Sequence, residues 1–575
     1  MAEQPWILKH GLAVISGLAL GLTRPIIDQM VSDIGQFHRD SALAVLLRLN
    51  LAVTHHRPLD QEDLLRRWLP DLAERFLAVM REQKATVVFY EAQVLNLIRL
   101  VILFAAPDAG RRCEQQGDFT LLARLLLQVT DFLAERDSKA DPDTRAWVFG
   151  NFTRTELFMH DEPRVPDAMA RNYDLFVLVP RLLSRRGHGY DLPGTFARIT
   201  GGLAIEDYIG LGFGLLTQYD TIDAGLIGHA DIGINRGTYL STVRTAADVR
   251  DRLWPLVSKP LAAYRAALQG EWDRTAGAAR WSAMTTFTQF PMIELPDGTV
   301  VAVSRRLLRD RITHGIYWIL ANGVPVDQRQ DFTNFFGHVF EAYVCRSLTR
   351  AAGRGFRWGV EYDGADTGKR PEGALVTPRS VALVEAKARR LLLNVREIGG
   401  EAELRAAVKP GLEEAADQLA TAIEAGRRGA IKDIETGEDT RYYPVIVTYE
   451  PLPSHPLAFR LYEEIIHRGG RLKGEAVKPV SLLTARDVES IEGIIWNGGA
   501  WPDLLTRKHT ERYADDSFHN YLYRTFAGQL PPNEYLRIRW QRIGDMIGTR
   551  LFGETLDQSA EESRGRRRHR HHPRR

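Results

Sequence analysis

The spacing of the apolar residues changes near residue 288, and this change constrains the fold more than any other feature of the sequence. From residue 1 to about 285, apolar residues recur three and four positions apart, as Leu43, Leu46 and Leu47 illustrate. This spacing is typical of helices that pack on one another. Beyond residue 288, short extended runs alternate with helical stripes. We therefore predict a multidomain protein with a mainly α N-terminal half, followed by an α/β domain built on a mixed central sheet.

Turn and linker residues divide this plan into five segments. Residues 1–285 are expected to form a helical domain, and residues 286–330 a β-hairpin and a connecting helix. Residues 331–510 carry the alternating pattern of the α/β domain, and residues 511–558 form a C-terminal helical segment. The basic tail, 559–575, has no apolar periodicity, and we expect it to be disordered.

Composition and charge limit what the chain can bind. Hydrophobic residues make up 44% of the chain and charged residues 26%, which is enough to bury large cores and excludes a wholly disordered protein. The net charge is +2, but seven arginines lie in the last twelve residues, so the rest of the chain carries a net charge of −5. A polyanion would therefore have to meet a local basic surface or the tail.

Cysteine usage and the apolar runs indicate a cytoplasmic protein. Cys113 and Cys345 are the only cysteines, and they are far apart in the sequence. A disulfide framework and a structural zinc site are thus disfavoured, and a reducing compartment fits best. The apolar run at residues 11–22 is too short to span a bilayer, and no small-x-small cleavage pattern follows it. We predict no membrane partner.

One acidic-x-Lys triplet ends an apolar strand. The chain contains three such triplets, and chance alone predicts roughly four, so the pattern by itself carries little weight. Two of them, at 82–84 and 137–139, lie in helical or polar stretches. Glu385 and Lys387 instead end an extended run, where the period of two places both side chains on the same face of a strand.

A second carboxylate, Glu372, opens the preceding short strand. If the two strands are adjacent and antiparallel, Glu372 lies beside Glu385. Carboxylate oxygens without a nearby sulfur or imidazole favour Mg²⁺, for which Mn²⁺ can substitute. Metal-assisted phosphodiester cleavage needs such ligands and a group that positions the water. Asp363 and Asp366 are alternatives for the first acid, although turn formation beside the glycines of their loop also accounts for them.

The choice of lysine rather than arginine at position 387 suggests a chemical role for this residue. Only 11 of the 75 basic residues are lysines, so the chain uses arginine where positive charge alone is needed. An ammonium group can shift its pKa and exchange a proton, whereas a guanidinium stays charged. Alternatively, Lys387 is the first member of a basic strand end that continues with Arg389 and Arg390.

Together these residues resemble the PD-(D/E)XK nuclease superfamily, which has the restriction-endonuclease-like fold. The resemblance covers about 331–500 and rests on four elements in order. They are Glu341 on the opening helix, a Pro-Glu pair ending at Glu372, the triplet from Glu385 to Lys387, and a helix carrying Gln418. The resemblance implies that Glu372 and Glu385 hold Mg²⁺ and that Lys387 assists the attacking water. It implies that Glu341 is an auxiliary acid in or beside the metal site. Gln418 would support the lysine or contact the substrate backbone.

Three of these positions also fit an ordinary structural role or depart from the family pattern. The family has Asp where this chain has Glu372, and the longer side chain changes the geometry of that carboxylate. Glu341 flanks the apolar stripe of its helix by one step, where an ordinary solvated carboxylate also sits. Gln418 belongs to a residue type that is common on exposed helix faces.

The resemblance implies a Mg²⁺-dependent endonuclease that hydrolyses phosphodiester bonds, and this plan suits bacterial defence against foreign DNA or phage. DNA is favoured over RNA because no aromatic-rich RNA-reading motif is visible. The helical half, 1–285, would then sense or position the substrate, or bind an unidentified protein partner. A homodimer would suit cleavage of both strands. The alternative function is a non-catalytic nucleic-acid-binding scaffold or sensor that keeps a nuclease-like fold.

Overall fold

In the computed structural model, the protein forms two compact units, and each unit consists of two separate stretches of the chain. The first unit comprises Met1–Trp147 and Tyr208–Gly315, and the second comprises Val148–Asp207 and Ile316–Arg575. The structure describes residues 13–14, 26–54, 61–82, 86–133, 149–150, 152–154, 164–220, 232–241, 247–362, 370–392, 395, 397 and 399–552. The expected disordered tail at 559–575 lies outside the described residues. The segment boundaries read from the sequence assume contiguous domains, whereas packing groups residues 148–207 with the C-terminal part of the chain.

The first unit is mainly helical. Its helices are α2 (Ile27–Gly35), α3 (Arg39–Val53), α4 (Gln61–Trp68), α5 (Ala73–Glu82), α6 (Glu91–Phe104), α7 (Gln116–Leu133), α13 (Ala247–Asp251), α14 (Trp254–Val257), α15 (Leu261–Arg274), α16 (Gly277–Ser282) and α17 (Thr285–Gln289). Two more helices, α12 (Ile205–Asp220) and α18 (Arg305–Gly323), each cross a division point between the units. Helix α6 is buried along nearly its whole length because α2, α3, α7 and α15 pack against it.

Short strands complete the first unit. They are β1 (Ala13–Val14), β2 (Thr86–Val87), β3 (Ile234–Asn235), β4 (Ser258–Pro260), β5 (Met292–Glu294) and β6 (Thr299–Ala302). Four of them form a mixed sheet in the order β3-β6-β5-β4. Strands β5 and β6 form the expected antiparallel hairpin, with Met292 opposite Ala302. Gly298 takes a φ of 80° in the turn between them, a conformation that glycine adopts without strain.

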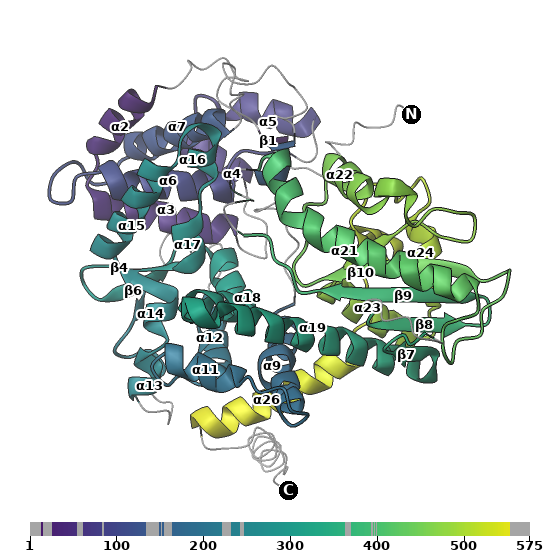
Figure 1. The fold of residues 1–575 in the computed structure, drawn as a ribbon. Helices are drawn as coiled ribbons and strands as arrows, with labels where there is room; N and C mark the ends of the chain where they lie inside the picture. Colours follow the sequence, from purple (N-terminus) through teal and green to yellow (C-terminus); the bar gives the residue numbers. More distant parts are fainter. Residues whose placement is uncertain are drawn as a thin grey trace, which may run out of the picture. The chain divides into compact units, whose positions relative to one another are not determined.

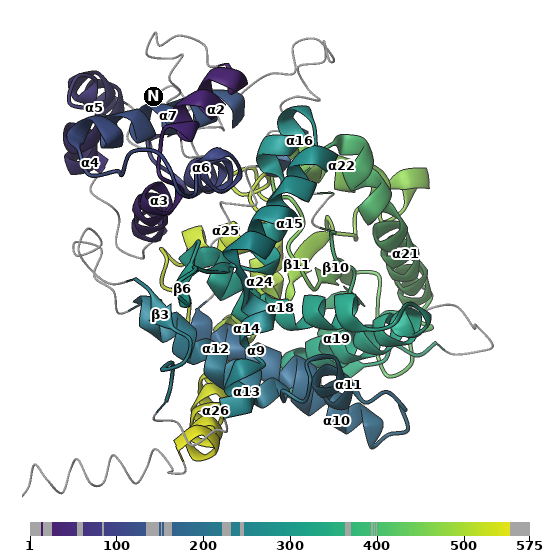
Figure 2. The ribbon, with the colours of Figure 1, turned by 90° about the vertical axis from the view of Figure 1, so that its left-hand side faces the viewer.

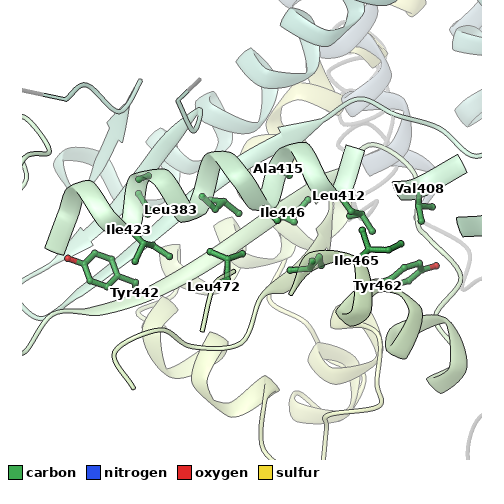
Figure 3. Close-up of a cluster of buried hydrophobic side chains, with 14 of the residues drawn as sticks. Leu383, Val408, Leu412, Ala415, Ile423, Tyr442, Ile446, Tyr462, Ile465 and Leu472 are labelled. Carbon is green, nitrogen blue, oxygen red and sulfur yellow. The ribbon is translucent and has the colours of Figure 1, made fainter. Parts of the chain in front are cut away.

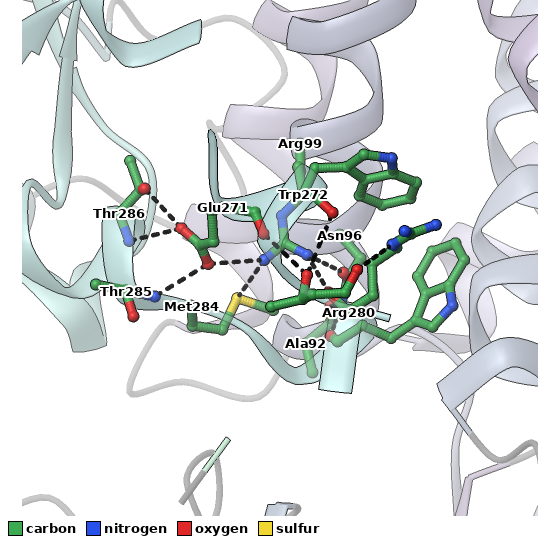
Figure 4. Close-up of polar contacts among 11 residues, drawn as sticks. Ala92, Asn96, Arg99, Glu271, Trp272, Arg280, Met284, Thr285 and Thr286 are labelled. Atoms are coloured by element: carbon green, nitrogen blue, oxygen red, sulfur yellow. Dashed lines mark hydrogen bonds and ion pairs between the residues drawn. The ribbon is translucent and has the colours of Figure 1, made fainter. Parts of the chain in front are cut away.

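A buried glutamate joins three helical segments of the first unit (Figure 4). The Glu271 carboxylate accepts hydrogen bonds from the backbone N–H groups of Thr285 and Thr286 at 3.2 and 3.0 Å, and from the Thr286 hydroxyl at 2.6 Å. Arg99 of α6 approaches the same carboxylate at 3.6 Å and donates to the Arg280 carbonyl at 2.7 Å. The carboxylate therefore satisfies N–H groups at the start of α17, which would otherwise lack a partner.

The second unit combines helices with a five-stranded sheet. Its helices are α9 (Val165–Tyr173), α10 (Val179–Ser184), α11 (Leu192–Ile199), α19 (Arg329–Ala352), α21 (Glu401–Arg427), α22 (Pro456–Ile466), α23 (Ala485–Trp496), α24 (Trp501–Lys508), α25 (Phe518–Thr525) and α26 (Glu534–Phe552). A short π-helical stretch, Asp174–Leu178, separates α9 from α10. The strands are β7 (Phe356–Trp358), β8 (Gly373–Thr377), β9 (Ser380–Lys387), β10 (Arg441–Thr448) and β11 (Ser481–Thr484). Helices α10 and α19 lie side by side although they are far apart in the sequence (Figure 2).

The sheet of the second unit is mixed, with the strand order β11-β10-β9-β8-β7. Strand β8 runs antiparallel to both β7 and β9, whereas β9, β10 and β11 run parallel to one another. Figure 1 labels β7, β8, β9 and β10 of this sheet. The extended runs predicted after residue 331 form these strands. The protein is thus mainly helical, with mixed sheets, and is compatible with the predicted α part followed by an α/β part.

Helices α21 and α22 cover one face of this sheet. Leu383 of β9 and Ile446 of β10 belong to one buried cluster with Leu412 of α21 and Ile465 of α22 (Figure 3). The apolar stripe predicted for the helix around residues 412–423 supplies the α21 side of this core. Removing these side chains from water provides the main stabilisation of the layer.

The other face of the sheet packs against α19, α23 and α24. Val384 and Val445 point to this side and line one small cavity together with Leu348 of α19 and Ile491 of α23. Side chains along β9 therefore alternate between the two helical layers, as the pleat of a strand requires. Glu385 lies two positions after a residue of the α21 layer, so it points toward α21.

Candidate active site

Glu372 directly precedes strand β8, and Glu385 lies near the end of the adjacent antiparallel strand β9. In the pairing of β8 with β9, Gly373 is opposite Val384. Glu372 is the residue before Gly373, and the charges of Glu385 and Lys387 both act on its carboxyl, so the three side chains lie near one another. Gly373 is needed beside them, because a Cβ at this position would lie 2.4 Å from the Phe356 ring. The expected antiparallel pairing of the two strands is thus present, with Glu372 just outside it.

Lys387 lies at the centre of a polar group on the α21 side of the sheet. Its Nζ is 2.7 Å from Glu385 Oε1 and donates a hydrogen bond to Gln418 Oε1 at 3.0 Å. The Glu385 side chain is 1% exposed and the Lys387 side chain 16% exposed. The structure therefore brings together Glu385 and Lys387 of β9, Gln418 of α21, and Glu372 from the residue before β8.

A further acid, Glu414, borders this group and was not predicted from the sequence. Its Oε2 lies 3.7 Å from Lys387 Nζ. Glu414 precedes Gln418 by four residues on α21, so both lie on the same helix face. Glu414 could have been predicted from the sequence, because it lies one helical turn before Gln418.

Glu341 lies at the edge of the group and is partly open to solvent. Its side chain is 32% exposed, and its carboxylate is 3.2 Å from His338 Nδ1. Its charge also raises the pKa of Glu372 and of Glu385. Glu341 is thus partly solvated, and its charge acts on both central carboxyls.

Burial and crowding raise the pKa of both central acids. Burial is the largest cause for Glu372, whose pKa rises to about 9, and the charges of Glu341 and Glu385 add to the effect. Burial raises the pKa of Glu385 to about 7, although Lys387 acts in the opposite direction. Glu385 Oε2 accepts no hydrogen bond from the described residues. Carboxylates in such surroundings are stabilised in their ionised form by a nearby cation.

The donor set suits a hard divalent cation. Glu372 and Glu385 offer carboxylate oxygens, which Mg²⁺ prefers. Within the part of the chain that the structure describes, no group of three or more His, Cys, Asp or Glu side chains has the arrangement of a metal cage. Mg²⁺ usually binds through one or two carboxylates and completes its shell with waters and substrate phosphates. Glu372 and Glu385 therefore fit this cation, with Glu341 beside them. Asp363 and Asp366, the alternatives for the first acid, lie outside the described residues.

Arg390 anchors the chain just after β9, whereas the sequence indicated only that it belongs to a basic strand end. Its guanidinium is 2% exposed and lies over the rings of Tyr317 and Tyr449, at 3.6 and 3.7 Å from their centroids. Nη1 donates to Glu450 Oε1 at 3.0 Å. Stacking and ion pairing hold this segment three residues after Lys387, which limits the movement of the lysine.

Comparison with known proteins identifies no relative of this chain. No protein-family model matches the chain, and neither a curated protein nor a solved structure matches it. Among the helices that the structure describes, none is both long enough and apolar enough to cross a bilayer.

Replacing Glu385 with glutamine is expected to stabilise the metal-free protein above pH 7. The ordinary pKa of this carboxyl is 4.5 and the folded value is about 7, so the folded state opposes its ionisation. The resulting penalty is absent below about pH 4.5, grows between pH 4.5 and about pH 7, and stays at the order of 3 kcal/mol above that. Urea denaturation in EDTA between about pH 4.5 and 8 should show that the advantage of Glu385→Gln increases with pH. A difference that stays constant over this range would contradict the expectation.

Proposed function

We propose that the protein is a Mg²⁺-dependent endonuclease that hydrolyses phosphodiester bonds, with DNA as its substrate. One observation carries this proposal, namely that two carboxylates and one amine lie near one another, at the end of β9 and just before β8. Glu372 directly precedes the β8 residue that pairs with Val384, the charges of Glu385 and Lys387 act on its carboxyl, and Lys387 Nζ is 2.7 Å from Glu385 Oε1. Metal-assisted hydrolysis of a phosphodiester requires such carboxylates and a group that positions the water.

Each side chain has a distinct role in the proposed reaction. Glu372 and Glu385 would hold the cation, with Glu341 as an auxiliary acid. A divalent cation bound there supplies charge neutralisation at the scissile phosphate. Lys387, held in place by Glu385 and Gln418, would orient the attacking water through a hydrogen bond. Its positive charge would also stabilise the negative charge that develops on the phosphate oxygens.

The order of the elements supports the assignment of 331–510 to the PD-(D/E)XK superfamily. Helix α19, which carries Glu341, precedes the antiparallel strands β7, β8 and β9, and α21 connects β9 to the parallel strand β10. The residues of the resemblance follow in the expected order. Glu341 lies on α19, Glu372 precedes β8, Glu385 and Lys387 lie on β9, and Gln418 lies on α21. We propose a restriction-endonuclease-like fold for this part on these grounds.

The remaining parts of the chain would serve the substrate. We assign to the helical first unit the sensing or positioning of DNA, or the binding of a protein partner. The cytoplasm remains the proposed compartment, since the chain has only two cysteines and both are free and buried. A homodimer would place two active sites on one duplex.

Digestion of supercoiled plasmid DNA tests the proposed function. We expect nicked and linear products with Mg²⁺ or Mn²⁺, and intact plasmid in EDTA. Glu385→Gln should leave the plasmid intact under both conditions. Glu361→Gln is the matched control, because Glu361 pairs with Lys432 at 3.2 Å on the exposed surface of the same unit. The proposal is refuted if every substrate stays intact with every divalent cation. The substrates to test are plasmid DNA and linear DNA, both double- and single-stranded.

A second candidate is a non-catalytic scaffold that binds nucleic acid. One observation favours it, namely glutamate at 372, where the family pattern has aspartate. This candidate predicts salt-sensitive DNA binding that neither EDTA nor Glu385→Gln alters, and no cleavage.

A further inference from the structure

A pocket of about 510 Å³ lies in the second unit. It is separate from the carboxylate site formed by Glu372, Glu385 and Lys387. Its volume is within the range of pockets that hold small ligands. Helices α19, α23 and α26 supply the lining, which consists of Arg350, Trp496, Glu534, Tyr535, Ile538 and Arg539, together with Arg542. Basic and aromatic side chains thus dominate one concave surface.

Trp496 offers an open aromatic face in this pocket. It ends α23 and is 57% exposed, and Ile538 nearby is 38% exposed. Tyr535 is different, because the Arg350 guanidinium already covers its ring at 3.6 Å from the centroid. A planar ligand would therefore stack on Trp496.

Arg542 is the arginine of this pocket whose positive charge is not paired with a carboxylate among the described residues. Arg350 is paired with Glu492 at 2.6 Å, and Arg539 with Asp174 at 2.9 Å. Glu534 is bound by Arg537 on the same helix. Arg542 is exposed and has no partner among the described residues. One free guanidinium is suited to a phosphate, which it can bind through two parallel hydrogen bonds.

We propose that this pocket binds a nucleotide, with the base stacked on Trp496 and the phosphate held by Arg542. The same chemistry describes a free mononucleotide and one nucleotide of a single DNA strand. Arg350 follows Glu341 by nine residues on α19, which corresponds to about 13 Å along the helix axis and the opposite helix face. The pocket is therefore separate from the carboxylate site, and its proposed role holds whether or not the protein is a nuclease.

Calorimetric titration of the full-length protein in EDTA tests this inference. The probes are deoxyadenosine monophosphate, deoxyadenosine, inorganic phosphate and a single-stranded hexamer of deoxyadenylate. We expect the monophosphate to bind more tightly than deoxyadenosine or phosphate alone. Trp496→Ala and Arg542→Ala should each weaken binding about tenfold or more.

Two matched variants control for general effects of the substitutions. Trp358 is 49% exposed on β7, and Arg379 is exposed in the turn between β8 and β9, so Trp358→Ala and Arg379→Ala should leave the affinity unchanged. Glu385→Gln should also bind normally, because the carboxylate site is separate. Binding that is lost in Glu385→Gln but kept in Trp496→Ala would overturn the inference and leave the nuclease proposal standing.

The probes also distinguish the source of the nucleotide. Tighter binding of the hexamer than of the monophosphate supports a strand of DNA as the ligand, and the reverse order supports a free nucleotide. Equal affinity for deoxyadenosine and its monophosphate, unchanged affinity in both pocket variants, or no binding of any probe at millimolar concentration would each overturn the inference.

Discussion

Replacing Lys387 with alanine should reduce Mg²⁺-dependent cleavage of plasmid DNA at least about 100-fold. This loss is typical when a group that positions a nucleophile or stabilises transition-state charge is removed. Lys387 Nζ is held between Glu385 Oε1 at 2.7 Å and Gln418 Oε1 at 3.0 Å, so its position is fixed from two sides. Lys387 also lowers the pKa of Glu385. Its removal should therefore make that carboxyl harder to ionise and weaken the binding of a cation.

Two further substitutions separate this chemistry from a loss of folding. Lys387→Arg should not restore cleavage, because a guanidinium is larger, planar and permanently charged. Lys432→Ala should cleave like the wild type, since Lys432 forms an exposed ion pair with Glu361. The proposed role of Lys387 is contradicted if Lys387→Ala keeps its melting temperature and also cleaves within about threefold of the wild-type rate.

Replacing Arg171 with methionine should lower the free energy of unfolding by about 3–5 kcal/mol, because it leaves a buried carboxylate without its cation. Arg171 of α9 donates to both carboxylate oxygens of Glu489 on α23, at 2.5 and 2.6 Å. Tyr343 of α19 donates to Glu489 Oε1 at 2.5 Å. The side chains of Arg171 and Glu489 are 7% and 4% exposed, so water cannot replace the lost partner.

Urea denaturation of three variants measures this effect. Arg468→Met removes an exposed pair with Glu413 and should change the free energy of unfolding by less than about 1 kcal/mol. The double variant Arg171→Met, Glu489→Gln removes the unpaired charge and keeps an acceptor for Tyr343. It should therefore be more stable than Arg171→Met alone. A loss below about 1 kcal/mol in Arg171→Met would show that this ion pair does not secure residues 148–207.

The parts of the site that depend on local geometry were predictable from the sequence. Glu385 and Lys387 are two residues apart at the end of an apolar run, and the period of a strand alone places them on one face. Glu372 was expected to open a strand that pairs antiparallel with β9; that pairing is present, but the strand begins at Gly373, one residue after Glu372. Gln418 was found by its place on the next helix.

Features that depend on contacts between distant segments were not predictable. Arg390 follows the triplet in an unremarkable basic stretch, and its aromatic partners Tyr317 and Tyr449 lie more than fifty residues away. Residues 148–207 have the same helical spacing as their neighbours, yet Arg171 pairs with Glu489 in the second unit. Apolar periodicity reports which face of a helix is buried, but not which segment covers it.

Binding of Mn²⁺, measured by calorimetry, tests the central claim that Glu372 and Glu385 form one cation site. We predict saturable binding to the wild type and affinity reduced at least about tenfold in both Glu372→Gln and Glu385→Gln. Glu361→Gln, which alters an exposed ion pair, should bind like the wild type. Equal affinity in all four proteins, or no binding to the wild type, would contradict the claim.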